Sequence, residues 1–267
     1  MQTASDPVAR RWSSTNLVGL PPGLLGSTAY NAHPQPLRIA GTRETHPGLF
    51  SLLERCGEPA PAREVFMHYL TIAFGLDETE PRRFRASAVK LLQGWALDAS
   101  SGAGAVLKGW AESRFGLVPV FHGEPLGRFP SPGWVRYLEQ KHASRFHNNN
   151  IQQQLDLLYE FCQWTLERFQ PLDPGPVLRL WRGSSHAAEQ VIAGSLRERR
   201  CTVRLNNVVS FSLDRDQAAC FGDWVFETWV PAPKLLVVPG LLPTRVLDGE
   251  GEVIALGGDY EVIASYA

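Results

Sequence analysis

The sequence predicts an α+β protein in which a mainly helical N-terminal part packs on a mixed β-sheet. Apolar residues recur at helical spacing between residues 63 and 169, and short apolar runs bounded by turn residues follow residue 176. The regular strand–helix alternation of a doubly wound fold is missing. We therefore expect a loop-rich and then helical region over 1–170 and a β-rich core over 171–267, joined in one compact unit.

Length, composition and charge restrict the class of protein. A chain of 267 residues, with 44% hydrophobic and 20% charged residues, is long enough to bury a substantial core. The formal net charge of −1 provides no field that would hold the chain on a nucleic acid. The first residues lack a secretory signal pattern, and no run approaches the ~20 apolar residues of a membrane span. We expect a soluble, cytoplasmic protein.

The metal-binding residue types do not form a recognisable site. The four cysteines are widely separated, and none has a histidine at metal-ligand spacing: Cys56, Cys162, Cys201 and Cys220. His142 and His147 lie five residues apart, but the further ligands that a metal ion needs do not accompany them. We expect reduced, mostly buried thiols and no metal.

The elements can be assigned in chain order, beginning with residues 1–62. This region is rich in proline and glycine, as in residues 17–36, and its apolar runs are short, as in residues 49–53. Such composition predicts loops and turns. We expect this part to lie over the rest of the molecule.

The helical pattern begins after residue 62. Phe84, Ala88, Leu91 and Trp95 lie three or four residues apart, as on one face of a helix. The pattern breaks at residues 98–104 and restarts through residues 106–116. Two or more helices are therefore expected in this stretch.

The clearest helix follows the run of asparagines at residues 148–150. Asparagine is a favoured N-cap residue, and apolar residues then recur at spacings of three and four as far as Phe169. Pro171 cannot continue the helix, so the helix is expected to end beside it.

The sequence pattern of the C-terminal region predicts short strands. Apolar runs stand at residues 177–183, 202–213, 224–231, 234–240 and 252–266. Two stretches with helical character interrupt them, at residues 186–196 and 215–222.

The first functional candidate is Arg182, at the end of the first strand and followed by Gly183. Alternation places Arg182 on the face that carries Leu178 and Leu180. An arginine fixed at a strand end presents a planar fork that suits a diphosphate or a buried carboxylate. The alternative is an ordinary strand-end arginine that reaches water.

The second candidate is the Ser210-Phe211-Ser212 segment. In an extended chain the two hydroxyl groups point to one side, where they can bind a ribose or orient a carboxylate. The alternative is a strand end that leads into a helix, in which Ser212 or Asp214 is the N-cap residue.

The third candidate is the Glu250-Gly251-Glu252 segment. In an extended chain the two carboxylates lie on one face, roughly 7 Å apart, and can serve one reaction centre with different tasks. Residues 246–267 contain five acidic residues and no lysine or arginine, which favours a cationic acceptor. The alternative is a pair of solvated acids in a turn.

The order of the three motifs within one β-rich half resembles the Arg-Ser-Glu class of ADP-ribosyltransferases. That class, which includes arginine-specific bacterial toxins and vertebrate ecto-enzymes, has a strand-end Arg-Gly, a Ser-x-Ser and a Glu-x-Glu. The resemblance implies that Arg182 and Gly183 hold the NAD diphosphate and that Ser210 and Ser212 lie at the nicotinamide ribose. It further implies that Phe221 packs on the dinucleotide, although core packing is an equal alternative.

The same resemblance distributes the chemistry between the two glutamates. Glu252 is expected to bind the ribose 2′-hydroxyl and to stabilise the positive charge that develops as nicotinamide leaves. Glu250 is expected to bind the acceptor guanidinium. NAD is then a consumed substrate, and no metal takes part.

Most of the chain is similar to the NAD(+)-dinitrogen-reductase ADP-ribosyltransferases of nitrogen-fixing bacteria. The likeness is carried by residues 148–161, 178–183 and 250–262. It implies that the target is dinitrogenase reductase, whose modification inactivates nitrogenase, and that a PII-type nitrogen-signalling protein regulates the enzyme. The alternatives are an NAD glycohydrolase, a transferase with another target, and a non-catalytic nucleotide-binding module.

Overall fold

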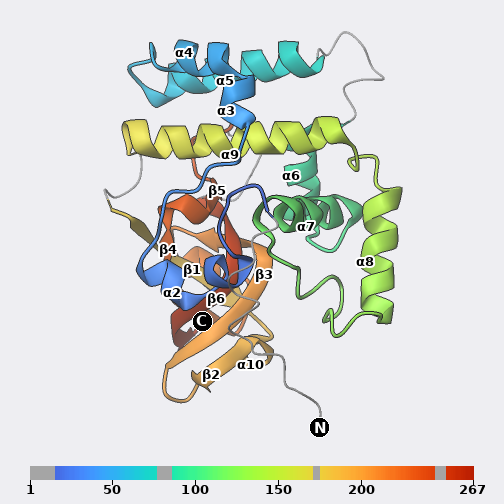
Figure 1. Ribbon diagram of the computed structural model, residues 1–267. Coiled ribbons are helices and arrows are strands. Elements are labelled where there is room, and N and C mark those ends of the chain that lie inside the picture. Colours follow the sequence, from blue (N-terminus) through green and yellow to red (C-terminus); the bar gives the residue numbers. More distant parts are fainter. Residues whose placement is uncertain (1–15, 77–85, 171–174, 244–250) are drawn as a thin grey trace.

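The computed structural model describes residues 16–76, 86–170, 175–243 and 251–267. It is an α+β structure, as expected. Helices form an upper layer and one side of the molecule, and an antiparallel sheet forms the rest (Figure 1). No helix in the described ranges combines the length and apolar character that a membrane span requires.

The N-terminal segment is more helical than its composition predicted. Four short helices occupy it: α1 (Pro22–Leu25), α2 (Thr28–Ala32), α3 (Thr42–Thr45) and α4 (Pro47–Leu53). Prolines stand at the first turn of α1 and α4, where the missing N–H and the fixed φ angle suit a helix start. The prolines that indicated loops therefore mark helix starts.

The longer helices agree with the periodic stretches of the sequence. They are α5 (Pro59–Phe74), α6 (Ala88–Leu97), α7 (Gly102–Phe115), α8 (Pro132–Ala143) and α9 (Asn149–Phe169). Ser87 caps α6 by accepting a hydrogen bond from the N–H of Lys90. Phe84, where the expected pattern began, lies outside the described residues.

Helix α9 connects the two layers of the molecule. The Asn148 side chain accepts a 3.0 Å hydrogen bond from the N–H of Ile151, which confirms the expected N-cap. On one side Phe161 stacks on Phe66 of α5, with ring centroids 3.9 Å apart. On the other side the Gln163 side chain donates to the carbonyl of Leu235 in the sheet. The helix thus lies between α5 and the β-sheet (Figure 1).

The C-terminal half contains a six-stranded sheet. Its strands are β1 (Val177–Ser184), β2 (Val191–Ser195), β3 (Arg200–Ser212), β4 (Trp224–Pro231), β5 (Leu235–Val237) and β6 (Glu252–Tyr266). The order is β2-β3-β1-β4-β6-β5, and β3 also pairs with β6. The pairings β3–β1, β1–β4, β4–β6 and β6–β3 therefore form a closed circuit.

The expectation of a mixed sheet was wrong, because every pairing between the described strands is antiparallel. A parallel pair needs a crossover of a dozen or more residues, usually through a helix. The helices between these strands are single turns, namely α10 (Ala187–Gln190), α11 (Arg215–Ala219) and η2 (Ala232–Lys234).

The prediction of a helix over residues 186–196 was only partly right. The observed helix α10 ends at Gln190, and Val191–Ser195 forms the edge strand β2, which pairs with β3. Gly194 has φ +73°, a left-handed conformation that a helix excludes. Pairing with a neighbouring strand has overridden the local helical pattern.

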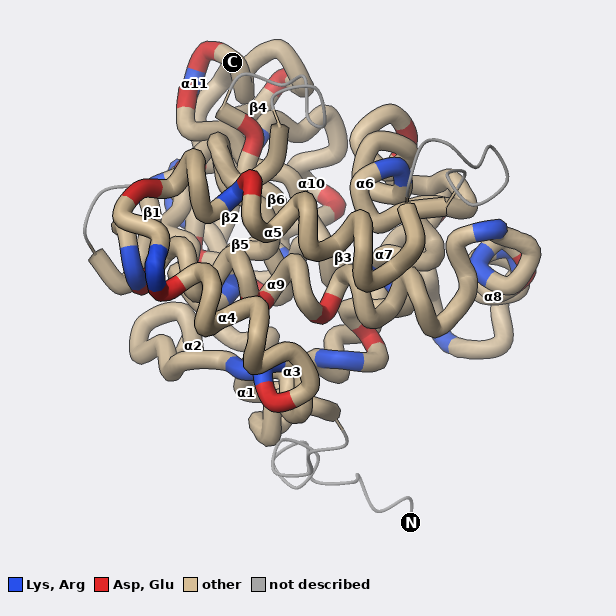
Figure 2. Tube along the Cα trace, turned by 90° about the horizontal axis from the view of Figure 1, so that it is seen from above, with Lys and Arg blue, Asp and Glu red and all other residues tan. Residues whose placement is uncertain are grey.

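Three helices stand beside the sheet. Seen from above, α6, α7 and α8 lie together on one side of the molecule, and β1 and β4 lie on the other (Figure 2). Helix α7 reaches the sheet through Asn207 of β3, whose side-chain amide donates 2.8 Å hydrogen bonds to the carbonyls of Lys108 and Leu117. This contact fixes the helical side against the middle of β3.

Lys234 is fully buried between two tyrosine rings. Its ammonium lies 5.4 Å from the ring centroid of Tyr30 and 4.7 Å from that of Tyr260, and its hydrogen bond to the Gly257 carbonyl is long, at 3.5 Å. Burial lowers the pKa of Lys234 from 10.5 to about 7, although the charge of Asp259 raises it. The charged form is therefore poorly stabilised in the fold.

Replacing Lys234 by Met is expected to increase the free energy of unfolding near neutral pH. Between about pH 7 and pH 10 the unfolded chain binds a proton at Lys234 that the folded protein does not. The stability of the unmodified protein should therefore rise with pH, by about 2 kcal/mol from pH 7 to pH 9, and this rise should vanish in Lys234→Met. Urea denaturation at both pH values measures it. An unchanged pH dependence would contradict the assignment.

Candidate active site

Arg182 lies two residues before the end of β1, and its side chain reaches Ser210 of β3. Its Nη1 donates a 2.7 Å hydrogen bond to the carbonyl of Ser210. Its Nε is buried and has no hydrogen-bond partner among the described residues. Burial lowers the pKa of Arg182, while the charge of Glu252 raises it. A guanidinium has five N–H donors, so this one keeps capacity for an anionic ligand.

Ser210 connects Arg182 to Glu252. The Ser210 hydroxyl donates a 2.7 Å hydrogen bond to Oε1 of Glu252, and the Ser210 carbonyl accepts the bond from Arg182. In the sheet, Ser212 lies opposite Trp181 of β1 and opposite Glu252 of β6. Three neighbouring strands therefore bring one cation, one hydroxyl and one carboxylate together.

Ser212 has a local role as well. Its hydroxyl accepts a 3.0 Å hydrogen bond from the N–H of Asp214, and the Asp214 carboxylate then caps α11. The sequence allowed either Ser212 or Asp214 as the N-cap residue, and the structure shows that it is Asp214. Ser212 forms the turn that precedes it.

Gly183 allows the segment after α11 to cross β1 closely. A Cβ atom at Gly183 would collide with the carbonyl oxygen of Ala218 and would lie 3.0 Å from Cβ of Phe221. Gly222 packs just as tightly on the backbone of Ser184. Phe221 is thereby held beside Gly183, and its side chain is 74% exposed. The alternative of core packing for Phe221 is excluded.

Glu250 lies outside the described residues, so Glu252 is the member of the Glu-x-Glu pair whose position the structure describes. Gly251 is described and has φ +75°. The expectation that Glu250 and Glu252 share a face falls on a residue outside the described ranges and stays a prediction. Strand β6 begins at Glu252.

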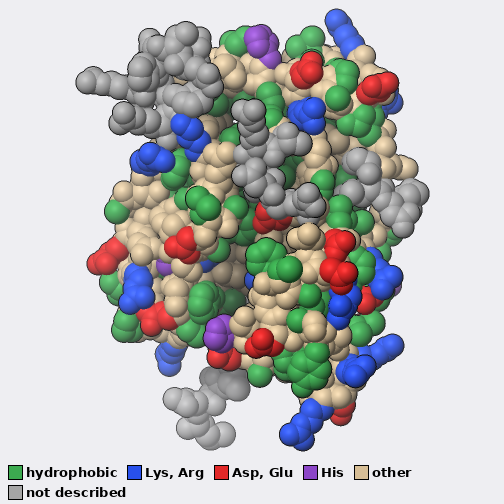
Figure 3. All heavy atoms as spheres, turned by 180° about the vertical axis from the view of Figure 1, so that it is seen from behind, with side chains coloured by type: hydrophobic (Ala, Val, Ile, Leu, Met, Phe, Trp, Pro, Cys, Tyr) green, Lys and Arg blue, Asp and Glu red, His purple; other side chains and the backbone are tan. Residues whose placement is uncertain are grey.

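A hollow lies on the rear face of the molecule, between the surface over α7 and α8 and the surface over the sheet (Figure 3).

Among the described residues, no group of three or more histidine, cysteine or acidic side chains could hold a metal ion. The four cysteines form no disulfide, and two of them, Cys162 and Cys201, are buried.

The sequence analysis did not identify the β-bulge at Asn206 and Asn207 or the glycine opposite it, Gly257. The pairing of β3 with β6 shifts register between Leu205 and Val208, so the two asparagines form a bulge. Only glycine fits at position 257, because a Cβ there would overlap the carbonyl of Asn206. Two adjacent asparagines inside an apolar strand were the available signal for this bulge.

Comparison with known proteins gives a consistent result. The family model described as dinitrogenase reductase ADP-ribosyltransferase matches residues 15–264. The chain is 47% identical over 264 residues to the NAD(+)--dinitrogen-reductase ADP-D-ribosyltransferase of Rhodospirillum rubrum, and the match covers 95% of each chain. No solved structure shows a significant match. By the extent of both matches, this chain belongs to the dinitrogenase reductase ADP-ribosyltransferase family.

Proposed function

We propose that this enzyme transfers the ADP-ribose group of NAD to an arginine of dinitrogenase reductase and thereby inactivates nitrogenase. The observation that carries the proposal is the hydrogen-bonded series Arg182, Ser210 and Glu252 on three adjacent strands. The 47% identity to an enzyme named for this reaction supports the choice of acceptor.

Arg182 is the residue that binds the diphosphate of NAD. One of its donors holds the Ser210 carbonyl, and its buried Nε lacks a partner among the described residues. A guanidinium has five N–H donors and can bind two phosphate oxygens at once. Gly183 lets the adjacent backbone approach closely, and the exposed ring of Phe221 offers a surface for stacking.

Glu252 stabilises the positive charge that develops on the ribose. Ser210 holds one carboxylate oxygen of Glu252, and the other can accept a hydrogen bond from the ribose 2′-hydroxyl. A fixed carboxylate needs no reorganisation when the bond from the ribose carbon to nicotinamide breaks. Ser212 contributes by shaping the turn that ends β3.

Glu250 binds the acceptor guanidinium and takes its proton. Nicotinamide leaves with the electron pair of the broken bond, and a guanidinium nitrogen forms the new bond to the ribose carbon. The proposal for Glu250 rests on the Glu-x-Glu motif alone. We further propose that the sheet is an ADP-ribosyltransferase core, that the enzyme is cytoplasmic, and that a PII-type protein regulates it.

The proposed function is tested with labelled NAD and purified dinitrogenase reductase. A labelled acceptor whose modified residue is arginine is the expected product. Release of nicotinamide without labelled protein would indicate an NAD glycohydrolase instead. Binding of NAD without either product would indicate a non-catalytic module. Label on a different protein in a cell lysate would identify another target.

Replacing Arg182 by Lys is expected to weaken NAD binding about tenfold or more while the protein stays folded. Lysine keeps the charge but loses the planar fork that binds two phosphate oxygens. Isothermal titration with NAD measures the dissociation constant, and Arg179→Lys on the same strand is the matched control. Arg179 pairs with Glu227 at 2.7 Å and lies outside the hydrogen-bonded series. Equal affinity of the two variants would show that Arg182 is structural.

A further inference from the structure

The segment between α7 and α8 contains a short hairpin at residues 120–126. The N–H of Leu126 donates a 2.8 Å hydrogen bond to the carbonyl of Val120, and Phe121 bridges to Pro125. A second bond, of 2.9 Å, joins the N–H of His122 to the carbonyl of Glu124. The hairpin is thus closed by its own backbone.

The backbone of Phe121 is anchored from two further elements. Asn206, in the bulge of β3, accepts a 3.1 Å hydrogen bond from the N–H of Val120 and donates a 2.9 Å bond to the Phe121 carbonyl. The same carbonyl accepts a 2.9 Å bond from the buried ammonium of Lys108 in α7. The position of Phe121 relative to β3 is therefore fixed.

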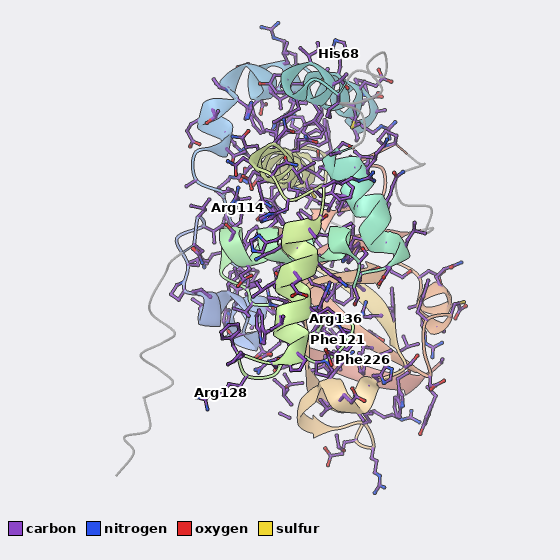
Figure 4. The ribbon with its side chains drawn as sticks, turned by 90° about the vertical axis from the view of Figure 1, so that its right-hand side faces the viewer. His68, Arg114, Phe121, Arg128, Arg136 and Phe226 are labelled. Atoms are coloured by element: carbon purple, nitrogen blue, oxygen red, sulfur yellow. The ribbon has the colours of Figure 1, made fainter. Side chains whose placement is uncertain are left out.

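Helix α8 holds the other side of the hairpin. Nε2 of His122 lies 2.7 Å from Oε1 of Gln140, and the guanidinium of Arg136 lies 3.7 Å from the Glu124 carboxylate. Figure 4 places Phe121 and Arg136 together on the side of α8 that faces the sheet. Three elements, β3, α7 and α8, thus determine the hairpin conformation.

The Phe121 side chain is presented to solvent despite this anchoring. It is 42% exposed, whereas its neighbour His122 is 1% exposed. An exposed aromatic ring on a preordered backbone loses little conformational entropy when it is covered by a partner, and aromatic residues dominate the binding energy of many interfaces. The ion pair of Arg136 and Glu124 supplies a polar rim beside the ring.

The distance between the hairpin anchor, Asn206, and Ser210 is short enough for one protein acceptor to cover both. Asn206, which holds the hairpin, is four residues from Ser210 on the same strand, and this separation is roughly 13 Å in extended backbone. A protein that docks over Ser210 and Glu252 would cover about 800 Å² of this surface, a disc of about 16 Å radius. Asn206, which anchors the hairpin that carries Phe121, lies within such a footprint.

From this placement we infer that Phe121 contacts the protein acceptor and helps to determine which protein is modified. The inference rests on the proposed function. It assigns recognition of the acceptor protein to the helical side of the molecule. An arginine in a small molecule, by contrast, would need only the site on the sheet.

The test compares three reactions of Phe121→Ala. Transfer to dinitrogenase reductase should fall about tenfold or more in kcat/KM, through a higher KM for the protein. Transfer to arginine methyl ester and release of nicotinamide without an acceptor should keep their rates, and the KM for NAD should not change. Phe121→Leu, which retains an apolar side chain, should recover most of the transfer to protein.

Ile72→Ala on α5 is the matched control, since Ile72 is also apolar and is 68% exposed. Equal transfer to protein by Phe121→Ala and Ile72→Ala would overturn the inference, as would a raised KM for NAD or a loss of all three reactions. If Phe121→Ala does not fold, Phe121→Ser replaces it and is read in the same way. Absence of all transfer by the unmodified enzyme would instead contradict the proposed function.

Discussion

Replacing Glu252 by Gln is expected to reduce both nicotinamide release and protein modification by about 10² to 10³. Glutamine keeps the size and one acceptor for the Ser210 hydroxyl, which now bonds the carboxylate at 2.7 Å. It removes the charge that faces the developing cation. Because both reactions pass through the same charged ribose, both rates should fall by the same factor. Single-turnover measurements of both products on one preparation provide the test.

The control for this prediction lies on the same strand. Glu261→Gln removes an exposed carboxylate from β6, far from Ser210 in the strand register. Its activity should equal that of the unmodified enzyme. The affinity of Glu252→Gln for NAD should change much less than its rate, since the charge acts mainly as the bond breaks. Near-normal turnover of NAD by Glu252→Gln would contradict the role of Glu252.

Replacing Glu250 by Gln is expected to abolish transfer to protein arginine but to leave measurable release of nicotinamide. The proposed partner of Glu250 is the acceptor guanidinium, and a carboxylate that pairs with a guanidinium forms charge-assisted, bidentate hydrogen bonds that an amide cannot form. Water, which intercepts the ribose in the absence of an acceptor, needs no such group. Nicotinamide and modified protein are again followed on one preparation.

The comparison between the two glutamate variants is more informative than either variant alone. Glu252→Gln should lower both products together, whereas Glu250→Gln should separate them. A proportional loss of both products in Glu250→Gln would place Glu250 with Glu252 in the cleavage step. Persistent transfer would show that another group binds the acceptor arginine.

Local patterns in the sequence predicted several elements well. The asparagine cap and apolar spacing predicted α9, and the apolar run of residues 252–266 predicted β6. Both depend on residues close together in the chain. The edge strand β2 was missed because its conformation depends on pairing with β3, which residues 186–196 do not encode by themselves.

The sequence by itself determined the residue types of the proposed site, namely a strand-end arginine, a Ser-x-Ser and a Glu-x-Glu in fixed order, and these carry the resemblance to the family. The tertiary structure decided that Arg182 bonds the Ser210 carbonyl, that Ser210 bonds Glu252, and that Asn206 of the same strand holds the hairpin with Phe121. These contacts join residues 28, 42 and 85 positions apart. Strand register and the bulge at Asn206 set such contacts, and both follow from packing between distant segments.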